Sequence, residues 1–149
     1  MNQKMIIEKV SNKLKLIRTE YGYTQDQMAL YIGVSKKTLV QIEKERIACN
    51  WSVAVAICTL FRKSHVLQNM MGGDPIEILE LTVHPSLEQT IQIEKNANVW
   101  WEIVDKDVRY RLEKNILSEY YRIVNKQDYC IFCSFDEVLA RRHFKKICS

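Results

Sequence analysis

Lysine and glutamine side chains recur at helical spacing in one short stretch, at Lys36, Lys37, Gln41 and Lys44. At about 100° per residue, these four residues and Val40 fall within one arc of roughly 140° on a helix. Lysines bind phosphates or guanine edges, glutamine can pair with adenine, and an exposed valine can contact a thymine methyl group. The pattern favours a helix face that binds DNA; the alternative is a solvated basic face on a small helical bundle.

Two short amphipathic segments around a tight turn must position this face. Thr24 opens a T-x-x-Q capping box, which predicts a first helix over about 24–32. Gly33 suits the left-handed end of a helix, and Ser35 can cap a second helix over 35–44. The spacing predicts that the buried side is formed by Met28, Ile32, Val34, Leu39 and Ile42, and Ala29 is small enough for the close approach of two helices.

Residues 14–61 resemble the XRE-type helix-turn-helix of phage Cro and repressor proteins. The resembling strings are LKLIRTEYGYTQDQMALYIGVSKKTLVQIEKERI and NWSVAVAICTLF, about a third of the chain. The resemblance implies a five-helix, lambda-repressor-like domain whose second motif helix enters the DNA major groove. It also implies a salt bridge between Arg18 and Glu43 that ties the first helix to the recognition helix.

The resemblance further implies which residues contact DNA. Gln25 would contact a phosphate of the DNA backbone, and Lys44 and Arg46 would lie near that backbone at the end of the recognition helix. Lys36, Lys37 and Gln41 would read base edges. The full expected set is Gln25, Ser35, Lys36, Lys37, Thr38, Val40, Gln41, Lys44 and Arg46. Glu45 and residues 47–49 stand where the family usually has Gly and then Pro. We therefore expect the loop after the recognition helix to differ from the family's loop.

Composition narrows the class of protein. The chain has 149 residues and 47% hydrophobic content, which suffices for a buried core. No apolar run approaches the roughly 20 residues of a membrane span. The N-terminal sequence lacks the apolar region of a signal peptide, so we expect a cytoplasmic protein without a membrane partner. His65, His84 and His143 lie apart without a matching nucleophile, and we expect no enzyme activity, catalytic residue or cofactor.

Charge divides the chain into two halves. Residues 1–71 hold 11 Lys and Arg against 5 Asp and Glu, whereas residues 72–149 hold 11 against 13. The basic half contains the motif, which points to a nucleic-acid partner for that half. We predict a DNA-binding domain over 1–71, an acidic helical connector over 72–98, and a small α+β domain over 99–149 that dimerises or senses a ligand.

Apolar spacing and capping signals predict the remaining helices of the first two segments. A first helix over 6–20, a fourth from Asn50 to Phe61 and a fifth from Ser64 to Gly72-Gly73 complete the five-helix domain. Asp74-Pro75 favours a helix start at PIEILEL. A further helix is expected over residues 86–95.

From Val99 onward the pattern changes to strand-like runs. VWWEIV, YRLEK, EYYRIV and YCIFC alternate with turn residues and predict a four-stranded antiparallel meander. Ser134 and Glu137 have capping-box spacing for a last helix over 135–147, which would pack on the sheet through Val138, Leu139 and Ile147. Trp100 and Trp101 are interpreted as core residues, with a ligand pocket or dimer surface as the alternative. The fold class is therefore α+β.

Five cysteines without a signal peptide argue against a disulfide framework, and Cys58 is interpreted as core packing. Cys130 and Cys133 form a C-x-x-C followed by His143 and Cys148, a set that could bind zinc. On a strand, however, residues three apart point to opposite faces. We therefore expect no metal site.

Two functional hypotheses follow. The first is a sequence-specific transcriptional regulator, a dimeric repressor of double-stranded DNA sites. The second is an antitoxin or adaptor whose C-terminal part binds another protein, with DNA binding secondary. A small-molecule or protein effector at the C-terminal domain is compatible with either hypothesis.

Overall fold

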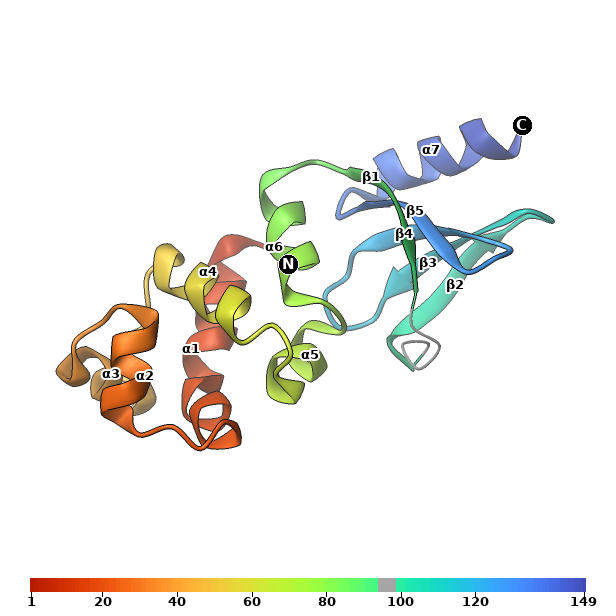
Figure 1. Ribbon diagram of the computed structural model, residues 1–149. Helices are drawn as coiled ribbons and strands as arrows, with labels where there is room; N and C mark the ends of the chain where they lie inside the picture. The colour runs from red at the N-terminus through yellow and green to blue at the C-terminus, as the bar shows by residue number, and fades with distance from the viewer. Residues whose placement is uncertain (94–98) are drawn as a thin grey trace. The chain divides into compact units, whose positions relative to one another are not determined.

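The chain folds into two units of different architecture. The computed structural model describes residues 1–93 and 99–149. One unit is helical and comprises Asn2–Leu79, and the other comprises Glu80–Ser149 together with Met1. Helices dominate the first and a sheet dominates the second, as Figure 1 shows, so the predicted α+β class is confirmed.

Five helices form the body of the first unit, as predicted. They are α1 (Gln3–Glu20), α2 (Gln25–Ile32), α3 (Lys36–Glu43), α4 (Trp51–Leu60) and α5 (His65–Met71). Each begins after a side chain that accepts a hydrogen bond from a first-turn amide, which satisfies a donor that has no partner within the helix. These capping residues are Asn2, Thr24, Ser35, Asn50 and Ser64. Thr24 and Gln27 form the complete capping box.

The core of this unit follows the helical spacing of its apolar residues. One stripe of α1 is fully buried together with the inner sides of α2, α3 and α4. Gly33 ends α2 in the left-handed conformation with φ +76°, which lets the chain turn into α3 within three residues. The fully buried side chains include Ile6, Val10, Leu14, Ile17, Met28, Leu39, Ile42 and Ile57.

The second unit is built on a five-stranded antiparallel sheet. The predicted helix at PIEILEL is confirmed as α6 (Pro75–Val83), which runs from one unit into the other. The strands are β1 (Leu87–Gln92), β2 (Trp101–Lys106), β3 (Tyr110–Asn115), β4 (Tyr121–Asn125) and β5 (Tyr129–Ser134). Their order is β1-β5-β4-β3-β2, so the four predicted strands form the expected meander.

The helix expected over 86–95 is wrong. Residues 87–92 form β1, an edge strand that pairs antiparallel with β5, and residues 94–95 lie outside the described part of the chain. A short polar segment adopts the backbone conformation that lets its N–H and C=O groups pair with neighbouring elements. Here β5 offers an unpaired edge, and β1 covers it.

The last helix, α7 (Glu137–Cys148), lies across one face of the sheet (Figure 1). Its Ala140 and Phe144 pack on Leu112, Ile123 and Phe132 of the strands. Leu139 and Ile147 join this cluster as predicted. The prediction for Val138 is wrong, because its side chain is 65% exposed.

The cap of α7 also differs from the prediction. Asp136, and not Ser134, accepts the first-turn hydrogen bond from the Leu139 amide. The Ser134 hydroxyl instead donates to the Pro85 carbonyl and accepts from the Asp136 amide. The helix therefore begins two residues later than the capping-box spacing indicates.

A bulge in β5 overturns the argument that Cys130 and Cys133 point to opposite faces. Val124 pairs with Cys130 and Ile123 pairs with Phe132, so Ile131 is an extra residue. Ile131 and Phe132 both pack on the cluster beneath α7, and the alternation is shifted by one. Cys130 and Cys133 consequently share the opposite face, with their sulfur atoms within 4.8 Å of each other.

Within the described part of the chain, no helix is both long enough and apolar enough to cross a membrane.

Candidate nucleic-acid interface

Helix α3 presents the polar face that the sequence predicts. Leu39 and Ile42 are buried on its inner side, and they hold the helix against the rest of the first unit. The opposite side carries Lys36 and Lys37, both exposed, and Gln41, which is partly exposed. The face therefore offers two ammonium groups and one amide to a partner in solvent.

The start of α3 is fixed by its own residues. The Ser35 hydroxyl oxygen accepts a hydrogen bond from the Thr38 amide, and the Ser35 hydroxyl donates to Thr38 Oγ1 at 2.9 Å. Lys36 lies beside Asp26 of α2, with Nζ 3.2 Å from Oδ2. Both side chains of this pair are largely exposed, so the pair is weak and Lys36 remains available to another anion.

Arg18 and Glu43 form the predicted salt bridge. Arg18 Nε lies 2.6 Å from Glu43 Oε1, and Nη2 lies 3.3 Å from Oε2. Arg18 Nη1 also donates to the Tyr23 carbonyl, just before α2 begins. The guanidinium thus joins the end of α1, the entry to α2 and the end of α3.

Gln25 belongs to the same network. Its Nε2 donates to Glu43 Oε2 at 2.9 Å, so the side-chain amide predicted to contact phosphate is engaged within the protein. Burial raises the pKa of Glu43, but the hydrogen bonds from Arg18 and Gln25 outweigh it and the pKa lies below its ordinary value. Glu43 therefore remains ionised and holds α1, α2 and α3 together. The sequence did not indicate this role for Gln25.

The chain leaves α3 through a left-handed residue, although no glycine is present. Glu45 has φ +59°, its amide donates to the Ile42 carbonyl, and the Arg46 amide donates to the Gln41 carbonyl. These two bonds are the Schellman pattern of a helix end. The helix end is therefore closed at Glu45 without a glycine, and exposed Lys44 and Arg46 flank the outer face of α3.

Of the nine predicted contact residues, eight lie on or directly beside α3, while Gln25 opens α2. Ser35, Lys36, Lys37, Lys44 and Arg46 are exposed, and Gln25, Thr38, Val40 and Gln41 are half-buried. Ammonium and guanidinium groups of this kind can bind phosphate, and a side-chain amide such as that of Gln41 can form the directional hydrogen bonds that base reading requires. The first unit can thus place one helix against nucleic acid.

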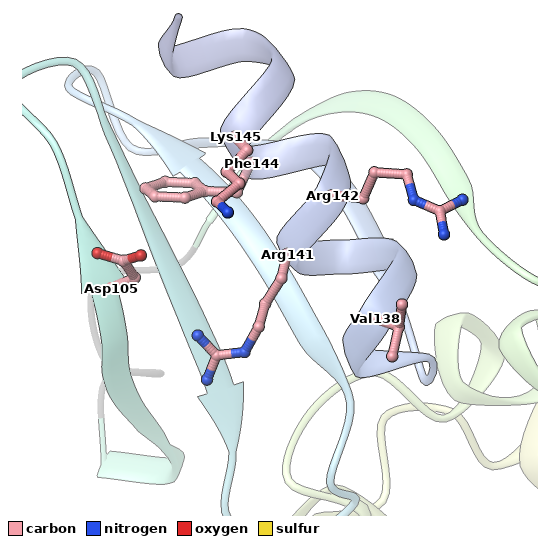
Figure 2. Close-up of a pocket in the computed structure, with 6 residues that line it drawn as sticks. All are labelled: Asp105, Val138, Arg141, Arg142, Phe144 and Lys145. Carbon is pink, nitrogen blue, oxygen red and sulfur yellow. The ribbon is translucent and has the colours of Figure 1, made fainter.

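The second unit carries a separate open hollow of about 420 Å³ between β2 and α7. Figure 2 shows Asp105 on the strand, with Arg141 and Arg142 pointing to opposite sides of the helix. Lys145, Phe144 and Val138 complete the lining. Arg141 is paired with Glu137 at 3.0 Å. The lining carries three cations and one carboxylate, and one of these cations, Arg141, is already paired outside the lining.

The helices and the face of α3 define a helix-turn-helix DNA-binding domain. A family model described as "Helix-turn-helix" matches residues 14–67. The chain is 33% identical over 52 residues to the "Uncharacterized HTH-type transcriptional regulator YgzD" of Bacillus subtilis (strain 168). That match covers 35% of this chain and 79% of the relative. No solved structure matches the chain. The chain belongs to the XRE-type helix-turn-helix family and is a DNA-binding regulator.

Proposed function

We propose that this protein is a transcriptional repressor that binds a palindromic DNA site as a homodimer and inserts α3 into the major groove. The observation that carries the proposal is the outer face of α3. It presents Lys36, Lys37 and Gln41 to solvent while Leu39 and Ile42 are buried beneath them. A helix whose buried side is fixed and whose exposed side is cationic and amide-bearing suits base reading.

The affinity that specific DNA binding requires supports a complex with two copies of the protein. One helix-turn-helix offers a small interface and few phosphate contacts, too little for tight specific binding. Two recognition helices about 34 Å apart reach successive major grooves on one side of the duplex. Repression follows from occupancy of such a site where it overlaps a promoter.

The second unit is our candidate for the dimer contact. Strand β2 is an edge strand that pairs with β3, and its Ile103 side chain is 58% exposed. Edge strands that carry exposed apolar residues can pair with a second copy through backbone hydrogen bonds. The cationic hollow beside α7 is the candidate position for an effector, which we expect to be an anionic small molecule.

Selection of binding sites from random duplex DNA with the full-length protein tests this function. We expect an enriched inverted repeat with half-sites about one helical turn apart, bound with an affinity that falls steeply with salt. Sedimentation measures the assembly separately, and we expect a dimer at micromolar concentration and on DNA. Enrichment of no sequence would contradict base reading, and a monomer in both states would contradict the dimer.

A regulated promoter is the remaining step of the test. A reporter gene placed behind the selected site is expected to lose expression when the protein is supplied. Increased expression would show an activator in place of a repressor, while leaving the DNA-reading face of α3 intact.

A further inference from the structure

Helix α7 carries basic side chains across the side that faces solvent. Its inner side is fixed on the sheet by Ala140 and Phe144. At about 100° per residue, the opposite side is centred near Val138, and four exposed cations fall within one arc of roughly 140° around that centre. The four cations, which we call the outer face of α7, are Arg141, Arg142, Lys145 and Lys146.

The cations of the C-terminal half are concentrated on this helix. Residues 137–148 hold four Lys and Arg against one acid, Glu137, whereas residues 72–136 hold 7 against 12. The small excess of acid in this half of the chain therefore conceals one strongly basic surface. A surface of one sign attracts partners of the opposite charge.

Neighbouring acids neutralise little of this charge. Glu137 pairs with Arg141 at 3.0 Å, but their side chains are 52% and 46% exposed, so solvent screens the pair. Among the described residues, the other three cations have no ion-pair partner. Two pairs of these cations lie four residues apart, a spacing at which like charges destabilise a helix. The arrangement therefore costs stability unless an anion binds to it.

A purely structural role at the helix end explains only part of the pattern. Lys145 and Lys146 lie in the last turn, where cations interact favourably with the helix dipole. Arg109 already supplies a cation at that end, because its Nη2 donates to the Cys148 carbonyl at 3.1 Å. The two arginines of the outer face lie one turn earlier, beyond the short range of the dipole effect.

We propose that the outer face of α7 is a second DNA-binding surface, which contacts backbone phosphates in any sequence. The inference rests on DNA binding by the helical unit, the function proposed above. Each strand of duplex DNA carries a phosphate every 3.4 Å of helix axis, and cations four residues apart on α7 are separated by about 6 Å along the helix. Guanidinium and ammonium groups form charge-assisted hydrogen bonds with phosphate. Three of the four cations also line the hollow beside β2, so a small anion bound there would compete with DNA.

Duplex DNA suits this helix better than a membrane surface. A helix that lies in a bilayer interface buries an apolar face there. The apolar side of α7 packs on the sheet instead, and its outer side exposes one large apolar residue, Val138. DNA is also the polyanion that a helix-turn-helix regulator binds, and a second contact made by the same chain benefits from a high effective concentration.

Binding of the full-length protein to duplex DNA of random sequence tests the surface without requiring base reading. Fluorescence anisotropy at several salt concentrations gives the slope of log affinity against log salt. Arg142→Gln/Lys146→Gln should reduce this slope by about 1.8 per bound chain, and Lys146→Gln alone by about 0.9. The matched control is Lys126→Gln, an exposed lysine between β4 and β5, which should keep the wild-type slope.

Three results would overturn the second surface. One is an unchanged slope in the double variant, and another is an equal reduction in the control. The third is wild-type binding to DNA by a double variant that no longer binds phosphatidylserine vesicles, which would assign the outer face of α7 to a membrane surface. Failure of the selection experiment to enrich any sequence would contradict base reading by α3 and leave these measurements unaffected.

A measurement on the wild-type protein covers the case in which a variant fails to fold. Lysines are acetylated sparingly with and without random duplex DNA at the same protein concentration, and the modified peptides are mapped. DNA is expected to protect Lys145 and Lys146 and to leave Lys126 unchanged. Lys36 and Lys37 report separately on α3, so their protection decides the proposed function. Without protection of Lys145 and Lys146, the second surface is rejected whatever happens at α3.

Discussion

Arg18 at the end of α1 and Glu43 at the end of α3 are joined by two hydrogen bonds, Nε to Oε1 at 2.6 Å and Nη2 to Oε2 at 3.3 Å. Their side chains are 14% and 4% exposed, so water screens the pair poorly. Gln25 donates to the same carboxylate. The orientation of α3 relative to α1 and α2 therefore depends on one shielded carboxylate.

Removing one member of this pair is expected to cost more than removing both. Arg18→Met leaves the buried Glu43 carboxylate without its main partner and should lower the free energy of unfolding by about 3 kcal/mol. The double variant Arg18→Met/Glu43→Leu removes both charges and should lose less. Urea unfolding of the two single variants, the double variant and the wild type measures the difference.

The exposed pair of Lys36 and Asp26 is the matched control for this experiment. Asp26→Asn should lower the free energy of unfolding by less than about 1 kcal/mol, because solvent already screens the pair. If the double variant Arg18→Met/Glu43→Leu is less stable than either single variant, the cost of losing one partner does not come from the unpaired charge of the other.

The same carboxylate predicts a dependence of stability on pH. Burial raises the pKa of Glu43, but hydrogen bonds from Arg18 and Gln25 lower it below the ordinary value of 4.5. The carboxylate binds protons less readily in the folded chain than in the unfolded chain. Its contribution is therefore fully present above pH 4.5 and is lost as the pH falls through the folded-state pKa.

Glu43→Gln should flatten this part of the pH profile. Unfolding free energies measured from pH 6 to pH 3 are expected to fall less steeply for the variant than for the wild type. Some slope should remain, because the pKa of Glu20 is also lowered: hydrogen bonds from Ser64 and the His65 amide outweigh its burial. Parallel profiles for the two proteins would contradict the assignment to Glu43.

The helical unit could be predicted from sequence because its signals are local. Thr24, Ser35 and Asn50 each cap a helix through contacts within three residues, and Gly33 meets a backbone requirement at its own position. The pair of Arg18 and Glu43 is a contact between distant residues, and it was available only through resemblance to a family.

The sheet unit was predicted less completely, since its details depend on pairing between distant strands. Nothing within residues 87–92 distinguishes an edge strand from a polar helix; the free edge of β5 decides it. The bulge at Ile131 is likewise set by register with β4, and strict alternation placed Cys133 on the wrong face. The role of Gln25 in binding Glu43 had no sequence signal either.

Glu45→Gly should stabilise the protein. Glu45 adopts φ +59°, a conformation that costs an L-residue roughly 1–2 kcal/mol. Glycine removes this strain but loses about 0.5–1 kcal/mol through the greater freedom of the unfolded chain. A net gain of about 0.5–1 kcal/mol is expected in urea unfolding. Glu45→Ala keeps the strain and should show no gain; equal stability of both variants would contradict a strained helix end.

Gln41→Ala should alter which DNA sequence is preferred, beyond lowering affinity. Gln41 carries the side-chain amide on the outer face of α3, and its backbone carbonyl accepts a hydrogen bond from the Arg46 amide in the turn, a bond that the substitution leaves in place. Loss of the side chain should cost about 1–3 kcal/mol at the selected site and relax preference at one base pair per half-site.

Lys44→Ala is the comparison that separates base reading from phosphate contact. Lys44 lies at the end of α3, and its loss should weaken binding to all sequences alike and reduce the salt slope by about 1. Fluorescence anisotropy on the selected duplex and on single-base variants, at several salt concentrations, measures both effects. If Gln41→Ala keeps the full discrimination between duplexes, the outer face of α3 does not read the base pairs.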